Sequence, residues 1–419
     1  MTDRSVASPA SRADAERRDA ADPLAPYRER FLPAGDVVAY LDGNSLGRPL
    51  RAVADRLARF CTEDWAGRLI RGWDEGWIDS PQTYGDRIAR AALGAADGQT
   101  VVADSTTVLL YKLARAAVDE QLAADPRRRE IVIDTDNFPT DRYIVEGIAA
   151  ERGTTLRWID ADPESGVTPE QVAAVVGPQT ALVLLSHVAY RSGFLADAPA
   201  ITRIAHDAGA LVLWDLCHSV GSVPLALDDW GVDLAVGCTY KYLNGGPGAP
   251  AFGYLAARHQ GRLQQPIRGW FGHRTPFAMG PGYEPAEGIR SLISGTPPVL
   301  AMVPLDANLD LLDEAGIGAV RAKSVALTSY ALELADELLV PHSVRVASPR
   351  DPSRRGGHVT VCAPGFDEVT VRLWKRGVIP DFRAPDGIRI GLAPLSTSFR
   401  EVLAGVTAIA EELVRPRRP

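Results

Sequence analysis

The stretch that decides the fold runs from residue 211 to residue 248. It begins with LVLWDLCHS (211–219) and, after an apolar run over 232–236, continues with GCTYKYLNGGPG (237–248). The first segment is typical of a buried strand that ends in Asp-x-x-His. The second places one lysine between an apolar strand and a glycine-rich loop. The pattern therefore predicts two charged side chains, Asp215 and Lys241, at the carboxyl edge of one sheet.

An aspartate and a lysine in this order suit an enzyme that holds pyridoxal 5'-phosphate. The lysine amine condenses with the cofactor aldehyde, and the carboxylate pairs with the pyridinium nitrogen, which keeps the ring an electron sink. Each residue alone has an ordinary interpretation, since a lysine beside a glycine-rich loop is usually solvated and an aspartate after a strand is often a helix N-cap. Their pairing, order and spacing favour Asp215 and Lys241 as catalytic residues.

Composition limits the classes of function. The chain has 419 residues, 46% of them hydrophobic, which is ample for a large core and suggests two or three structural units. A net charge of −8 without a sustained basic run argues against nucleic-acid partners and against anionic membranes. The cysteines lack metal-site spacing, so no metal is expected. Without a signal segment or a membrane-spanning apolar stretch, the sequence predicts a cytoplasmic protein.

Apolar segments along the chain alternate between strand and helix patterns. Strands are expected near 101–103, 131–133, 182–185 and 211–214, and helices near 107–122, 141–151 and 198–208. This alternation predicts an α/β fold with a mainly parallel central sheet sandwiched by helices. Ligands on such sheets bind at the carboxyl ends of the strands.

We expect four units along the chain. They are a disordered segment over 1–23, an arm over 24–65 that packs with the small domain, a large cofactor-binding domain over 66–300, and a linker helix with a small α+β domain over 301–419. One helical pattern runs from Pro298 to Leu339. Beyond it, strands are expected near 343–347, 357–362 and 388–391, with helices near 367–376 and 398–414.

Seven motifs together resemble bacterial kynureninase, a family of fold-type I pyridoxal phosphate enzymes in the class V aminotransferase-like superfamily. They are WDLCHSVGSVP (214–224), GCTYKYLNGGPGAPAF (237–252), YLDGNSLG (40–47), FPTD (138–141), GWFGH (269–273), YEP (283–285) and GT (295–296). Each motif alone has little specificity, but the set is highly specific. The resemblance covers about residues 24 to 412.

The resemblance implies a homodimer with composite active sites. It implies hydrolysis of the β,γ carbon–carbon bond of L-kynurenine, or of 3-hydroxykynurenine, to anthranilate or its hydroxylated form and L-alanine. Such an enzyme belongs to the kynurenine pathway of tryptophan catabolism and NAD biosynthesis. Two alternatives stay open: a homologue acting on a modified kynurenine in secondary metabolism, and another class V enzyme such as a desulfurase or an aminotransferase. A non-catalytic protein is disfavoured, because Asp215, Lys241 and Arg389 are all retained.

The resemblance also implies which residues hold the cofactor. Two threonines at a helix start would bind its phosphate, an aromatic ring would stack on the pyridine, and Tyr240 would touch the phosphate and serve as a proton donor. Two further residues, Trp270 and Thr296, would reach the site of the partner subunit. The full set is Thr106, Thr107, Phe138, Pro139, Thr140, Asp141, Asp215, His218, Tyr240, Lys241, Trp270 and Thr296.

The expected substrate-binding residues are Arg389, Trp73, Asn44 and Ser45. An arginine binds a carboxylate through two parallel hydrogen bonds, and the resemblance assigns the substrate α-carboxylate to Arg389. It assigns the aryl end to Trp73. Four positions depart from the bacterial pattern and bear on the choice of substrate. They are Leu109 and Ala189 where asparagine is usual, Arg268 where a small residue is usual, and Ser396 where tyrosine is usual.

Overall fold

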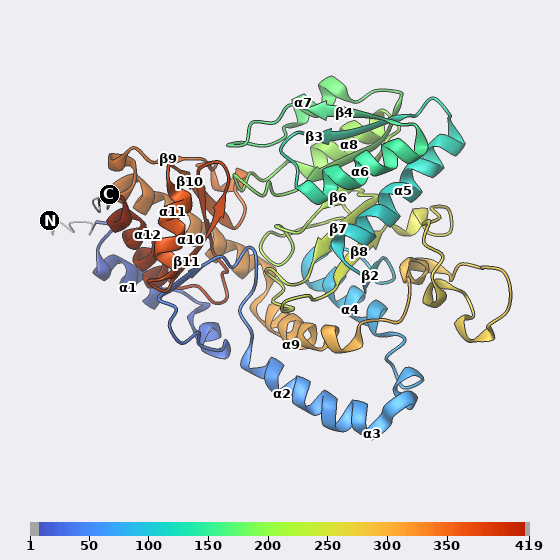
Figure 1. Ribbon diagram of the computed structural model, residues 1–419, viewed down its shortest axis with the longest axis horizontal. Coiled ribbons are helices and arrows are strands. Elements are labelled where there is room, and N and C mark those ends of the chain that lie inside the picture. The colour runs from blue at the N-terminus through green and yellow to red at the C-terminus, as the bar shows by residue number, and fades with distance from the viewer. Residues whose placement is uncertain (1–7, 415–419) are drawn as a thin grey trace.

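The computed structural model describes residues 8–414, and a seven-stranded sheet forms the centre of its larger domain (Figure 1). The strand order is β2-β8-β7-β6-β5-β3-β4. The strands are β2 (Thr100–Ala103), β3 (Glu130–Asp134), β4 (Thr155–Ile159), β5 (Thr180–Ser186), β6 (Leu211–Asp215), β7 (Leu234–Cys238) and β8 (Ala251–Leu255). Only β8 runs antiparallel to its neighbours. The predicted mainly parallel sheet is therefore confirmed.

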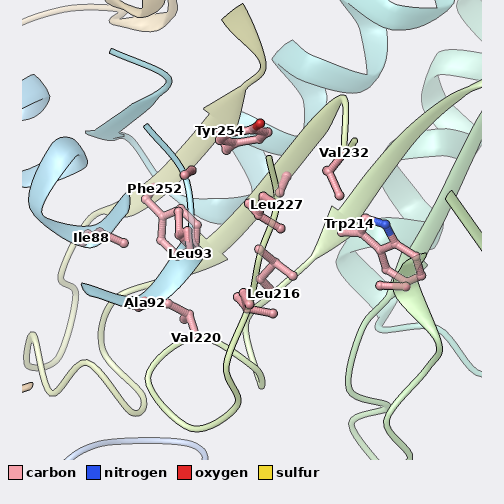
Figure 2. Close-up of a cluster of buried hydrophobic side chains, with 14 of the residues drawn as sticks. Ile88, Ala92, Leu93, Trp214, Leu216, Val220, Leu227, Val232, Phe252 and Tyr254 are labelled. Carbon is pink, nitrogen blue, oxygen red and sulfur yellow. The ribbon is translucent and has the colours of Figure 1, made fainter. Parts of the chain in front are cut away.

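Helices cover both faces of this sheet. They are α4 (Ser80–Ile88), α5 (Thr106–Ala124), α6 (Pro139–Arg152), α7 (Pro169–Val175) and α8 (Ala198–Asp207). Successive strand residues pack into different clusters: Leu213 lies in one with α5 and α6, whereas Trp214 lies in another with α4 and α8. Figure 2 shows part of the second cluster, where Phe252 lies near Ile88 and Leu93, and Trp214 lies on the other side of the view, near Val232. Burial on both faces explains the continuous apolar runs of these strands.

The small domain contains a five-stranded sheet in the order β1-β11-β12-β10-β9. The strands are β1 (Ala39–Leu41), β9 (Arg345–Val346), β10 (His358–Cys362), β11 (Val378–Arg383) and β12 (Gly387–Gly391). Helices α10 (Ile317–Leu338), α11 (Phe366–Trp374) and α12 (Phe399–Val414) pack on it. Strand β1 pairs in parallel with β11, so a segment from near the N-terminus completes this sheet.

Two segments differ from the sequence-based expectation. Residues 12–20 lie in the segment predicted as disordered, yet they form α1 (Arg12–Ala20), capped by Ser11 and anchored by Ala15 in the small-domain core. Short polar helices gain their stability from such tertiary contacts, which composition does not reveal. Residues 1–7 of the predicted segment lie outside the described residues. The single helix expected over 298–339 is broken at Gly316, with φ of 74°, into α9 (Val299–Ala315) and α10.

The remaining α-helices lie between β1 and α4. They are α2 (Arg51–Arg59) and the short α3 (Ala66–Arg68), and a π-helical turn over Phe60–Trp65 connects them. Helix α2 packs against α9 and extends along one side of the molecule (Figure 1). No helix within residues 8–414 combines the length and the apolar character needed to cross a membrane.

Candidate active site

A cavity of about 250 Å³ lies at the carboxyl edge of the large sheet. The starts of α5 and α6 line it together with the loops that follow β6 and β7, so four separate elements converge there. Nine lining residues belong to the predicted set. They are Thr106, Thr107, Phe138, Thr140, Asp141, Asp215, His218, Tyr240 and Lys241. Pro139 is the first residue of α6 and lies between two of them in the chain.

Lys241 differs from the other three lysines of the chain. Lys112 and Lys323 are buried and paired with carboxylates at 2.6 Å and 2.7 Å, whereas Lys375 is exposed. Lys241 is 8% exposed and has no carboxylate within ion-pair distance among residues 8–414. Its Nζ lies 3.3 Å from Nε2 of His218 and 6.0 Å from the centre of the Phe138 ring. A buried amine without a counter-ion is suited to covalent attachment of a ligand.

Two buried carboxyl groups belong to the same cavity. Asp215 ends β6, and its Oδ1 accepts a hydrogen bond from the backbone N–H of Cys217 at 2.7 Å. Asp141 is also buried, and within the described chain its Oδ2 has no hydrogen-bond partner. Burial, with the nearby charge of Asp215, raises the pKa of Asp141 well above its usual value. A cation such as a pyridinium ring would reduce the repulsion between Asp215 and Asp141 and would give these carboxyl groups a charged partner.

Tyr240 and His218 differ in whether they can donate or accept a proton near Lys241. Burial, together with Cys238 and Cys217, raises the pKa of Tyr240 above its usual value, so its phenol keeps its proton. Burial and the positive charge of Lys241 hold the pKa of His218 well below its usual range, so its imidazole is neutral. The site thus has one group able to donate a proton and one neutral acceptor.

The start of α5 forms the part of the cavity wall that is suited to an anion. Ser105 is the N-cap, and its side chain accepts a hydrogen bond from the backbone N–H of Val108. The hydroxyls of Thr106 and Thr107 lie in the first turn, where free backbone N–H groups and the helix dipole attract anions. These residues fit the phosphate of pyridoxal phosphate, while Asp215, Lys241 and Phe138 fit its ring and aldehyde.

Arg389 lies outside the cavity, on β12 of the small domain. Its side chain is 1% exposed, with Nη1 donating to the carbonyl of Tyr190 and Nη2 to Oγ of Ser45, each at 2.8 Å. The Tyr190 ring meets the Phe138 ring edge-on at 5.4 Å, which connects Arg389 to the cavity wall. Asn44 is fully buried, and neither polar atom of its side chain has a partner within residues 8–414.

Three further predicted residues, Trp73, Trp270 and Thr296, also lie outside the cavity of their own chain. Trp73 packs on Phe271 at 5.7 Å, and Phe271 packs on Trp270 at 4.6 Å. Trp270 is 44% exposed and Thr296 is exposed. Their predicted reach into a partner subunit therefore stays a prediction.

Sequence reasoning missed several residues at or beside the site. The cavity is also lined by Asp104, Ser105, Cys217, Gly248, Ala249 and Ala251. Asp381 on β11 contacts Arg389, but no strand was expected there. Alternation between apolar and charged side chains over 380–383 is the signal that could have revealed it. None of the four residues that depart from the bacterial pattern lines this cavity. Leu109 is in the core, and Ala189, Arg268 and Ser396 lie elsewhere.

Comparison with solved structures defines the class of fold. The fold matches a C-DES mutant with glycine covalently linked to the PLP cofactor, with a TM-score of 0.79, 18% identity and coverage of 92% of this chain and 99% of that one. It matches a cysteine desulfurase from Thermococcus onnurineus NA1 with a TM-score of 0.75, 17% identity and coverage of 96% and 98%. The chain therefore has the fold-type I architecture of the class V, pyridoxal phosphate-dependent enzymes.

Sequence comparison then identifies the family. A model of the kynureninase C-terminal domain matches residues 320–409, and a model of the DegT/DnrJ/EryC1/StrS aminotransferase family matches 92–224. Kynureninase from Pseudomonas fluorescens is 42% identical over 410 residues, covering 97% of this chain and 96% of that protein. Kynureninase from Burkholderia pseudomallei (strain K96243) is 42% identical over 407 residues, covering 96% and 95%. The chain belongs to the kynureninase family.

Proposed function

We propose that this protein hydrolyses the β,γ carbon–carbon bond of L-kynurenine to anthranilate and L-alanine. The observation that supports this function is the 42% identity to a kynureninase over 97% of the chain, which includes the residues of the cavity. Identity of 17–18% to the solved desulfurase-like structures supports only a shared fold.

Each end of pyridoxal phosphate has matching residues in the cavity. Thr106 and Thr107 would bind its phosphate, Phe138 would stack on its ring, Asp215 would pair with its ring nitrogen and Lys241 would attach to its aldehyde. Pro139, Thr140 and Asp141 complete the wall beside the ring. When bound, the cofactor withdraws electrons from the substrate carbon that bears the amino group.

The protein's own contribution is to move protons and to orient the substrate. After the substrate amine has displaced it, Lys241 would accept the proton from the substrate α-carbon. The neutral imidazole of His218, 3.3 Å away, would keep that amine oriented. Tyr240, whose phenol keeps its proton, would donate it to the β-carbon when the bond breaks.

The substrate carboxylate would bind in the small domain. Arg389 and Ser45 already lie together, and Asn44, which precedes Ser45 in the chain, has a buried side-chain amide with no partner within residues 8–414. An unpaired buried amide costs free energy unless a ligand supplies its partner. A bound α-carboxylate would satisfy both Arg389 and Asn44, while Trp73 would flank the aryl ring.

A desulfurase activity has less support from the cysteines. Such an enzyme needs an accessible thiolate, and Cys217 is the cysteine that lines the cavity. A hydrogen bond with Cys238, together with burial, raises the pKa of Cys217, which keeps it a thiol. Cys61 is exposed, but it lies on the π-helical turn after α2 and does not line the cavity.

We also propose a cytoplasmic homodimer with composite sites, acting in the kynurenine pathway of tryptophan catabolism. Large apolar side chains are exposed on the loop that carries Trp270, with Phe277 at 55% and Met279 at 73%. Such patches are typical of subunit interfaces. A second subunit covering this loop would bring Trp270 and Thr296 to the partner's cofactor.

The test is to incubate the purified holoenzyme separately with kynurenine and 3-hydroxykynurenine. We expect fluorescent anthranilate, or its hydroxylated analogue, in equal amount to L-alanine. The Lys241→Ala variant is the blank. Release of sulfide from cysteine, with no aryl product from either kynurenine, would contradict the proposal in favour of the desulfurase alternative.

A further inference from the structure

Lys112 is a buried lysine beside the cavity that the proposed mechanism does not use. It belongs to α5, and its side chain has no solvent exposure. Its Nζ donates to Oδ2 of Asp104 at 2.6 Å, to the carbonyl of Leu292 at 2.5 Å and to Oγ of Ser294 at 2.5 Å. An ammonium group has three hydrogens, so all of its donors are used.

The first partner of Lys112 belongs to the turn that precedes the predicted phosphate-binding residues. Asp104 has a φ of 46° and directly precedes Ser105, the N-cap of α5. A non-glycine residue keeps such a φ only when its surroundings hold it. Besides Lys112, the hydroxyl of Ser294 donates to the same Asp104 oxygen at 3.0 Å. Lys112 therefore helps to hold the turn that presents Thr106.

The other two partners belong to the segment that carries a predicted cross-subunit residue. Leu292 and Ser294 directly precede Gly295-Thr296. The same segment packs against the loop of Trp270, because a Cβ added at Gly269 would lie only 1.8 Å from the carbonyl oxygen of Ser294. A single ammonium group thus connects the phosphate turn of one cavity to both residues predicted to serve the partner's cavity.

We propose that Lys112 is a positioning residue that joins the phosphate turn at 104–107 to the segment at 292–296 and so retains the cofactor phosphate. This inference rests on the proposed cofactor site. Lys112 does not line the cavity and acts through Asp104 and Ser294. Without the ammonium, the carboxylate of Asp104 loses its counter-charge beside the phosphate position and repels that anion.

Lys323 provides a matched control, because it is also a buried lysine with a carboxylate partner. It lies on α10, and its Nζ is 2.7 Å from Oδ2 of Asp22. Neither residue of this pair lines the cavity. A purely structural role for Lys112 would make Lys112→Met and Lys323→Met alike in every measurement.

The experiment is to remove pyridoxal 5'-phosphate from each holoenzyme variant and to titrate it back, measuring its Kd and the Tm of the apo form. For Lys112→Met we expect the Kd to rise about tenfold or more, because a hydrogen-bonded charge pair is lost. For Lys323→Met we expect an unchanged Kd despite a lowered Tm. The double variant Lys112→Met/Asp104→Asn should regain affinity, since it lacks the repelling charge.

An unchanged Kd in Lys112→Met, or an equal rise in Lys323→Met, would overturn the proposal. If Lys112→Met does not fold, Ser294→Ala replaces it, because this variant keeps the ion pair and loses only the two hydrogen bonds of the Ser294 hydroxyl. Its Kd should rise by a smaller factor, and an unchanged value overturns the proposal. No kynurenine is used, so an error in the proposed substrate leaves the result intact. Failure of the wild-type protein to bind the cofactor would instead contradict the proposed site.

Discussion

The guanidinium of Arg389 lies 2.5 Å from the carboxylate of Asp381 on the neighbouring strand. Asp381 is shared, because Nε of Arg383 also lies 2.8 Å from it. Within the described chain, Nε of Arg389 has no hydrogen-bond partner. Arg389 is therefore held in place by Asp381, Ser45 and the carbonyl of Tyr190, and its Nε–H is free to donate to a ligand.

Replacing Arg389 should weaken substrate binding without loss of the cofactor. Arg389→Leu removes the charge that matches the α-carboxylate. We expect kcat/KM to fall by the factor that corresponds to a loss of about 2–5 kcal/mol in transition-state binding, mainly through a higher KM. The fold should survive, since Asp381 keeps Arg383 as a partner. Arg355→Leu is the control, because Arg355 is equally buried but donates to backbone carbonyls of Pro349 and Arg350. Loss of cofactor absorbance with an unchanged KM would assign Arg389 a structural role.

Asp215→Asn should lose most activity and keep some cofactor. The amide oxygen can still accept the N–H of Cys217, but a neutral group cannot hold the ring nitrogen protonated. We expect kcat to fall by about 10²–10⁴-fold. Asp141→Asn should have a smaller effect, because the raised pKa of Asp141 already favours its neutral form. Equal kcat values for Asp215→Asn and wild type would refute the electron-sink role.

Composite sites predict complementation between two variants. Lys241→Ala should abolish turnover, and Thr296→Ala should weaken phosphate binding in the partner's site. After subunit exchange, both defects in a heterodimer fall in the same site, which leaves the other intact. Activity above the average of the two parents, measured after mixing, is the expected result. Additive activities in a mixture proven to contain heterodimers would show that each chain builds its own site.

The aryl end should discriminate against a ring hydroxyl. Trp73 packs on Trp77 and Phe271. Phe271 packs in turn on Trp270, whose indole N–H is already bonded to the carbonyl of Pro276. A hydroxyl buried there without a partner costs about 1–3 kcal/mol. We therefore expect kcat/KM to be higher for kynurenine than for its 3-hydroxy form, with ring preferences altered by Arg268 and Ser396. A strong preference for the hydroxylated substrate would exclude this aryl pocket.

Stability should depend on pH through Asp134. Burial, with the charge of Asp136, raises the pKa of Asp134 to about 7. The folded state then binds this proton more tightly than the unfolded state, so the contribution is fully present below about pH 4, the unfolded pKa, and is lost as the pH rises towards 7. Asp134→Asn cannot ionise, so its Tm relative to wild type should be higher at pH 8 than at pH 5. Asp207→Asn, at an exposed position, is the control. A difference in Tm between Asp134→Asn and wild type that does not change with pH would show that ionisation of Asp134 does not affect stability.

Most of the large sheet and the centre of the site could be predicted from local patterns, whereas strands β4 and β8 were not expected. The apolar runs at 182–185 and 211–214 form strands because both of their faces are buried. Asp215 and Lys241 follow adjacent parallel strands, and such strand ends meet at one edge. The alternation of strand and helix patterns was sufficient to predict these strands and the positions of Asp215 and Lys241, because each element is specified by its own periodicity.

Only the tertiary structure decided which distant segments meet. Ser45 reaches Arg389, and Ser294 reaches Lys112, although 344 and 182 residues respectively separate the two members of each pair. The break at Gly316 and the docking of α1 have the same origin. Local periodicity determines whether a segment is a helix or a strand and which face is apolar. The partner of a buried charge depends on how whole elements pack, because the free energy of pairing arises only after other segments have excluded water.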